Sequence, residues 1–219
     1  MSSIIKKNEL GQFDTPKKIA TSIMSFISYN YDCFIDLGAG LGVLSSPFHD
    51  KKGVMIELDV DRYKVLKSSE STNISIINGD VLDEELCLKQ ITGDDSILFI
   101  SNPPFHRKNS GYNFKYFDSL NIGNLFHQLD IAFLDKVLAS KNSKSSIVFI
   151  VSAPFIESEK YSIQRDKFVK EFQSIEVISL DIRTFVQAEV QSYVLIAHPL
   201  SSNFNKGISL KNMNLNGDI

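Results

Sequence analysis

Short apolar runs alternate with stretches of helical spacing along most of the chain, and this alternation constrains the fold more than any other feature. The apolar runs that predict strands are residues 33–37, 54–57, 74–77, 97–100 and 147–151. The spacings that predict helices are at residues 16–27, 59–68, 126–139 and 158–172. Two β-rich runs, 175–180 and 190–197, follow and are close enough to pair. Because buried strands alternating with helices are typical of a parallel sheet, we predict an α/β fold with seven strands. The sheet is expected to be mostly parallel, with a late antiparallel strand and helices on both faces.

Length and composition indicate one domain. With 219 residues and 43% hydrophobic content, the chain can bury one substantial core, which we place at residues 1–199. The polar residues 200–219 are rich in Asn and Ser and predict a loosely ordered tail. The net charge of −3 gives no general attraction for nucleic acid.

The compartment is predicted from what the sequence lacks. No apolar run approaches the length of a membrane span, and the first residues lack the apolar stretch of a signal peptide. Cys33 and Cys87 have no metal-ligand spacing around them, which favours reduced thiols. We therefore expect a cytoplasmic protein that does not interact with membranes.

The run at residues 97–100 ends in Ser101 and then Asn102-Pro103-Pro104-Phe105. Two prolines fix φ and remove N–H donors, so the chain is stiff and extended here and cannot continue a regular element. The side-chain carbonyl of Asn102 and the main-chain carbonyl of Pro103 are then two acceptors side by side. This pair suits the binding of a planar –NH2 group, and the ring of Phe105 can lie flat on the base that carries it.

A glycine-rich turn follows the first predicted strand. Residues 36–42 read Asp-Leu-Gly-Ala-Gly-Leu-Gly, and Glu57 ends the next strand about 20 residues later. Glycines let a backbone approach a ligand closely, and an acid at that distance can accept hydrogen bonds from ribose hydroxyls. The turn therefore predicts a nucleotide-type cofactor.

The acid at the start of the turn narrows the choice of cofactor. Asp36 would repel a pyrophosphate but suits an ammonium or sulfonium group, and S-adenosylmethionine carries both. Its carboxylate can meet N–H groups at a helix N-terminus. Asp80, after the third predicted strand, can accept a hydrogen bond from the adenine amine of that cofactor.

Residues 11–16, 36–42 and 102–105 together resemble the motifs of S-adenosylmethionine-dependent amino-group methyltransferases. The resemblance spans about residues 8–198 and is strongest to the adenine-N6 DNA methyltransferases of restriction-modification systems, whose first motif precedes the glycine turn. It implies a Rossmann-like catalytic domain at residues 1–199, with residues 13–16 closing over the methionine part of the cofactor. It also implies direct methyl transfer to a base flipped out of its stack.

The residues and the resemblance together give a set of predicted sites, none of them a metal site. Catalytic roles are predicted for Asn102, Pro103, Pro104 and Phe105. Cofactor-binding roles are predicted for Phe13, Thr15, Pro16, Asp36, Gly38, Ala39, Gly40, Glu57, Leu58, Asp80, Val81 and Asn102. Substrate-binding roles are predicted for Phe105, Arg107, Lys108 and Phe185.

Several of these residues also have a purely structural interpretation. Asp80 can cap a helix, Thr15 can begin one, and Phe185 can belong to the core. Residues 102–105 can be a stiff loop with no role in binding, and the basic and aromatic segment 106–123 can be a solvated lid.

The substrate is the least constrained prediction. DNA adenine is favoured, although few residues follow the predicted sheet where related DNA enzymes carry a recognition region, so a separate recognition subunit is a candidate partner. The segment 101–106 also resembles that of ribosomal-RNA guanine-N2 methyltransferases. The alternatives are therefore adenine N6 or guanine N2 of structured RNA, a protein glutamine amide, and a non-catalytic partner subunit that only keeps the fold.

Overall fold

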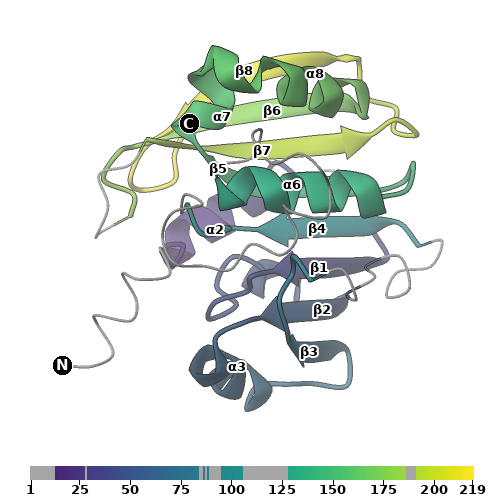
Figure 1. Ribbon diagram of the computed structural model, residues 1–219, viewed down its shortest axis with the longest axis vertical. Coiled ribbons are helices and arrows are strands. Elements are labelled where there is room, and N and C mark those ends of the chain that lie inside the picture. Colours follow the sequence, from purple (N-terminus) through teal and green to yellow (C-terminus); the bar gives the residue numbers. More distant parts are fainter. Residues whose placement is uncertain are drawn as a thin grey trace.

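The computed structural model describes residues 13–27, 29–83, 86, 88, 95–105, 128–185 and 191–219. Within these ranges the chain forms one sheet of eight strands in the order β3-β2-β1-β4-β5-β7-β6-β8 (Figure 1). The strands are β1 (Cys33–Leu37), β2 (Lys52–Glu57), β3 (Ile74–Asn78), β4 (Ile97–Ser101), β5 (Ser146–Ser152), β6 (Phe172–Leu180), β7 (Ser192–Pro199) and β8 (Gly207–Met213). Only β7 runs antiparallel to its neighbours β5 and β6. The predicted α/β fold with a late antiparallel strand is confirmed.

Helices cover the sheet as the alternating pattern predicts. They are α2 (Lys17–Met24), α3 (Val60–Lys67), α6 (Leu129–Ser140), α7 (Ala153–Glu157) and α8 (Ser162–Lys170), with short 3-10 turns at Ser46–Phe48 and Glu159–Tyr161. Successive strand residues point to opposite faces, so Phe34 and Ile35 enter two different apolar clusters. Helices α6, α7 and α8 lie in front of the sheet in Figure 1, and α2 packs into the cluster on the other face.

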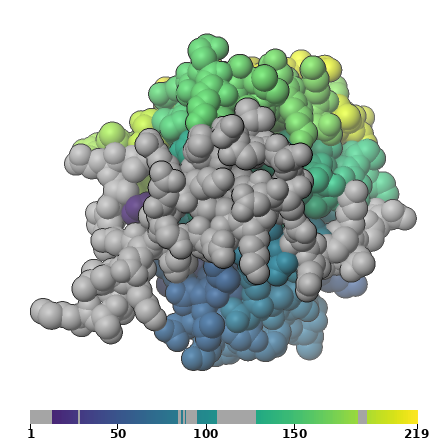
Figure 2. Space-filling model, viewed as in Figure 1, coloured from purple at the N-terminus to yellow at the C-terminus, as the bar shows by residue number. Residues whose placement is uncertain are grey.

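The space-filling view shows how these elements are distributed over the molecule. The α7–α8 region (green) and the α3 region (blue) lie at opposite ends of it (Figure 2). None of the helices in the described part of the chain is both long and apolar enough to cross a membrane.

The carboxyl ends of the central strands meet at one edge of the sheet. Strands β1 and β4 pair in parallel, with Asp36 opposite Ile100. One residue further on, the Ser101 hydroxyl donates a hydrogen bond of 2.6 Å to the Leu37 carbonyl. The segment that begins at Asn102 therefore starts beside the glycine turn, although 64 residues separate Ser101 from Leu37.

Residues 200–219 differ from the predicted loosely ordered tail. They contain β8, which pairs in parallel with β6 and gives the sheet eight strands where seven were predicted. Leu210 of β8 is exposed and Met213 is buried, so this edge strand is held largely by its backbone ladder and gives little apolar signal in the sequence. Beyond it, Gly217 has a φ of 88° and lies against Ser22 of α2.

Candidate active site

The glycine turn begins directly after β1. Gly38 and Gly40 have φ values of 68° and 61°, a region that favours glycine because a Cβ would be strained there. The N–H groups of Gly38 and Ala39 both donate to the Ile56 carbonyl of β2, at 2.9 and 3.0 Å. A Cβ at Gly38 would meet the ring of Phe133 in α6 at 3.4 Å. The turn is therefore tied to β2 on one side and packed against α6 on another.

Glu57 ends β2 and holds the turn through its carboxylate. Its Oε2 accepts a hydrogen bond from the Gly40 N–H at 2.6 Å, and its Oε1 accepts one from the Asp59 N–H at 2.8 Å. Burial raises the pKa of this carboxyl, and the two N–H donors oppose the rise. The next residue, Leu58, is exposed, and its carbonyl accepts from the Asn78 side chain. Glu57 thus accepts from one N–H group of the turn and one at the N-cap of α3, and its contact with a ribose stays a prediction.

Asp36 is buried within β1 and is only 1% exposed. Its Oδ2 has no hydrogen-bond partner among the residues that the structure describes. Burial raises the pKa of Asp36 to about 7, the Ser45 hydroxyl lowers it, and the nearby Glu57 carboxylate raises it. The carboxyl thus changes charge near neutral pH. Because it is buried, it would act on a cofactor cation through the protein interior and not through solvent.

Asn102 joins the motif after β4 to the N-terminal block of the resemblance. Its Nδ2 donates to the Phe13 carbonyl at 2.7 Å and to the Thr15 Oγ1 at 3.1 Å. No described residue donates to its Oδ1, which is left as an acceptor. Pro103 is buried and Phe105 is half-buried. The amide of Asn102 is therefore oriented by its two donor contacts.

Residues Phe13–Pro16, which we call the strap, lie at the same edge of the sheet. Thr15 is buried, Pro16 is the N-cap residue of α2, and Asp14 forms an ion pair with Arg62 of α3 at 2.8 Å. The structure thus brings together the three sequence blocks that carry the resemblance.

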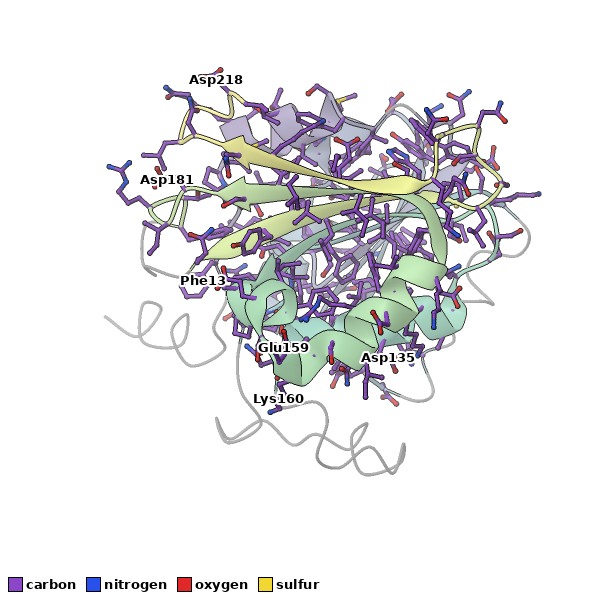
Figure 3. The ribbon with its side chains drawn as sticks, turned by 90° about the horizontal axis from the view of Figure 1, so that it is seen from above. Phe13, Asp135, Glu159, Lys160, Asp181 and Asp218 are labelled. Atoms are coloured by element: carbon purple, nitrogen blue, oxygen red, sulfur yellow. The ribbon has the colours of Figure 1, made fainter. Side chains whose placement is uncertain are left out.

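Three phenylalanines connect the strap with two loops. The ring of Phe185, after β6, lies 6.2 Å from that of Phe13 and 6.4 Å from that of Phe105, in tilted and edge-on geometry. Figure 3 shows Phe13 at the same end of the molecule as Asp181, which directly follows β6. Phe185 is only 3% exposed, so it packs between the other two rings in this conformation. Its contact with a flipped base stays a prediction.

The remaining predicted residues divide into two groups. Asp80 accepts a hydrogen bond from the Leu82 N–H at 2.9 Å, as a turn-capping residue does, and Val81 is buried. Their contact with the cofactor adenine stays a prediction. Arg107 and Lys108, with the rest of segment 106–123, lie outside the described residues.

Two features of this edge were missed by the sequence analysis. The Asp14–Arg62 pair joins residues 48 positions apart, and no local pattern links them. Asp130, at the start of α6, is fully buried and accepts hydrogen bonds from the Ser152 N–H and hydroxyl at the end of β5. The sequence offered one signal for Asp130, which is an acid among the apolar positions of the predicted helix 126–139.

Comparisons with known proteins give a family. A family model described as ribosomal RNA adenine dimethylase matches residues 4–160. Curated protein sequences give no match.

Solved structures share the fold at low sequence identity. The methyltransferase subunit of a type I restriction-modification system from Streptococcus thermophilus has a TM-score of 0.66 at 17% identity, covering 92% of this chain and 47% of its own. A putative class I S-adenosylmethionine-dependent methyltransferase from Listeria monocytogenes has a TM-score of 0.67 at 16% identity, covering 92% and 66%. The 23S rRNA methyltransferase ErmE has a TM-score of 0.57 at 17% identity, covering 89% and 72%. The chain thus spans less than two-thirds of the length of the Streptococcus and Listeria proteins.

The fold is one shared with S-adenosylmethionine-dependent methyltransferases. The chain belongs to the ribosomal RNA adenine dimethylase family, whose model covers most of its length. S-adenosyl-L-methionine is accordingly the cofactor, and the site fits it in two respects. Gly38 and Gly40 give the turn a left-handed backbone that other residues rarely adopt, and the two nearby acids, Asp36 and Glu57, suit a ligand with cationic groups.

Proposed function

We propose that this protein transfers a methyl group from S-adenosylmethionine to the exocyclic N6 amine of adenine in RNA. The observation that carries the proposal is the orientation of Asn102. Both of its contacts with described residues use Nδ2 as donor, to Phe13 and Thr15, so Oδ1 is available to accept from a substrate amine. The family match over residues 4–160 supports adenine as the base and RNA as the polymer.

The chemistry follows from the two acceptors. Adenine N6 is a poor nucleophile because its lone pair is delocalised into the ring. The Asn102 Oδ1 and the Pro103 carbonyl accept its two hydrogens, which favours a pyramidal nitrogen with a localised lone pair. When bound, the cofactor supplies a sulfonium-linked methyl group. With the cofactor bound, the nitrogen would form the new N–C bond as the C–S bond broke, and would then lose a proton that had become acidic, so the site needs no strong general base.

Positioning supplies much of the rate enhancement. Holding two reacting groups in line can contribute about 7–11 kcal/mol. Taking a base out of a helical stack costs a few kcal/mol, and stacking on an aromatic ring returns about 1–3 kcal/mol per base. Phe105 is half-buried and directly follows the two acceptors, so it is the ring proposed for that stacking.

DNA is the second candidate polymer. The sequence blocks 11–16 and 102–105 favoured DNA adenine, and the Streptococcus restriction-modification subunit shares the fold. The family match favours RNA instead, and it covers the same blocks. We therefore place RNA first, and a separate recognition subunit belongs to the DNA alternative.

The test is methyl transfer by the purified chain from labelled S-adenosylmethionine to deproteinised ribosomal RNA, transfer RNA and genomic DNA and, separately, to a nucleic-acid-free protein extract, with nucleoside mass spectrometry of the nucleic acids. N6-methyladenine or its dimethyl form in RNA supports the proposal. Label only in DNA supports the second candidate, and label in guanine N2 or in a protein fraction contradicts both. If no fraction is labelled although the cofactor binds, a non-catalytic subunit is the better account.

Removing the carboxylate of Glu57 is expected to weaken cofactor binding. In Glu57→Gln we expect the dissociation constant of S-adenosylmethionine to rise about tenfold, because a charged acceptor for the ribose hydroxyls is lost. Calorimetry and the thermal shift produced by the cofactor measure this. Glu171→Gln is the matched control, since Glu171 pairs with Lys141 next to the start of β6, at the other end of the strands. Equal affinities for Glu57→Gln and the unaltered protein would remove Glu57 from the ribose role.

A further inference from the structure

The Asp14–Arg62 ion pair lies directly on the glycine turn. Arg62 Nη1 is 2.8 Å from Asp14 Oδ1, and the two side chains are 12% and 27% exposed. A Cβ at Gly40 would meet the same Nη1 at 2.8 Å and the same Oδ1 at 3.7 Å. The pair therefore rests against the backbone of Gly40, whose N–H is bound by Glu57.

Arg62 is well placed to act as a fixed anchor. It stands in the first turn of α3, where the Asp59 side chain caps the helix by accepting from the N–H groups of Asp61 and Arg62. Glu57 lies close enough for the guanidinium to lower the pKa of its carboxyl. Arg62 thus faces two acids, one from the strap and one from β2.

The strap is held from two sides by interactions of different kinds. On the β4 side, the neutral amide of Asn102 binds the Phe13 carbonyl and the Thr15 hydroxyl. On the α3 side, the ion pair binds Asp14, the residue between them. Asp14 therefore ties the strap to α3, while its two neighbours tie it to Asn102.

We propose that the Asp14–Arg62 pair is the latch that closes the strap over the glycine turn and so sets how long S-adenosylmethionine stays bound. The inference rests on the proposed function, since it concerns the cofactor of that site. Neither residue touches the reacting atoms, so both are positioning residues. The pair is largely withdrawn from water, so opening the strap has to separate two partly buried opposite charges, which slows it while the pair is intact.

Opening of the strap can be measured without the cofactor. The chain contains no tryptophan, so Phe13→Trp places a single fluorescent reporter on the strap. In this background, Arg62→Gln is expected to raise acrylamide quenching about twofold. Lys64→Gln is the matched control, because Lys64 is on the same helix and pairs with Asp61 in an exposed contact at 3.5 Å. Exposed pairs contribute little, so this control should quench like the parent.

Residence time is measured by stopped-flow dissociation of S-adenosylmethionine from the chain without the reporter. Asp14→Asn and Arg62→Gln are each expected to raise the dissociation rate about tenfold, equivalent to about 1.4 kcal/mol, and the double variant no further. The exchange Asp14→Arg with Arg62→Asp should make dissociation slower than in either single variant, short of full recovery because an acid at position 62 faces Glu57, and Arg62→Lys should lie between Arg62→Gln and the unaltered protein. Thermal unfolding of each variant confirms that it is folded.

The outcomes separate the latch from the proposed function. Unchanged quenching and unchanged dissociation in Arg62→Gln would overturn the latch, whatever substrate the enzyme uses. A charge exchange that restores nothing would also overturn it, because the effect would then belong to Arg62 alone. If the unaltered protein does not bind S-adenosylmethionine, the cofactor assignment and the residence-time claim both fail, and quenching alone decides whether the pair holds the strap.

Discussion

Replacing Asn102 with alanine is expected to lower the rate of methyl transfer by about 10²–10³-fold, the usual cost of removing one preorganised polar group from a reacting centre. The change removes the Oδ1 acceptor proposed for the adenine amine. It also removes the Nδ2 donor to Phe13 and Thr15, so cofactor affinity should fall severalfold as the strap loosens. Single-turnover kinetics at saturating cofactor separate the two effects.

Asn102→Asp is the variant that distinguishes acceptor from donor. It keeps an oxygen facing the substrate amine but places a carboxylate oxygen against the Phe13 carbonyl and the Thr15 hydroxyl, where Nδ2 now donates. We expect weaker cofactor binding than in the alanine variant and a transfer rate at saturation between those of the alanine variant and the unaltered protein. If Asn102→Ala transfers methyl groups at the normal rate, the proposed mechanism is wrong.

Asp36→Asn is expected to stabilise the free protein at alkaline pH and to weaken its binding of the cofactor. The buried carboxyl has a pKa raised to about 7, far above its unfolded value of about 3.8, so the folded state keeps its proton over a range where the unfolded state has lost it. The free energy of unfolding therefore falls as pH rises from about 4 to 7, and this loss of stability is complete above pH 7. Asparagine has no such deficit. The expected gain is on the order of 2–4 kcal/mol at pH 8.5, and close to zero near pH 4.

Two measurements check this prediction. Urea unfolding at pH 4.5 and pH 8.5 should show the gain of Asp36→Asn at the higher pH only, and an equal gain at both would show that ionisation is not its cause. Calorimetry should show that the unaltered protein binds S-adenosylmethionine more tightly as pH rises through 7, because a cationic ligand favours the ionised carboxyl. The asparagine variant should lose this pH dependence.

The sheet could be predicted from the sequence because its strands are apolar throughout and alternate with helices. The same reasoning failed for β8, where Leu210 is exposed and the strand is held by backbone pairing that leaves no apolar pattern. Asp36 was expected to face the cofactor, and its burial follows from alternation: Phe34, two residues earlier, enters an apolar cluster on the same face. Only tertiary structure could reveal the pairing of Asp14 with Arg62.

The candidate site divides in a similar way. The sequence blocks at residues 11–16, 36–42 and 102–105 were singled out, and the structure gathers their described residues at one edge. The sequence alone left Phe185 equally suited to base stacking and to the core, because an aromatic residue in a loop has the same signature in both cases. Its position between Phe13 and Phe105 depends on three segments that meet only in the folded chain.

That position has a thermodynamic consequence. Phe185 touches one ring on the strap and another in the motif proposed to bind the substrate amine, so displacement of either ring is transmitted to the other. A ligand that orders the strap also orders the surface on which the target base would stack. By reciprocity, binding of a base to that surface must raise the affinity for the cofactor by the same factor. The two reactants are thus expected to bind cooperatively, each retaining the other until the methyl group has moved.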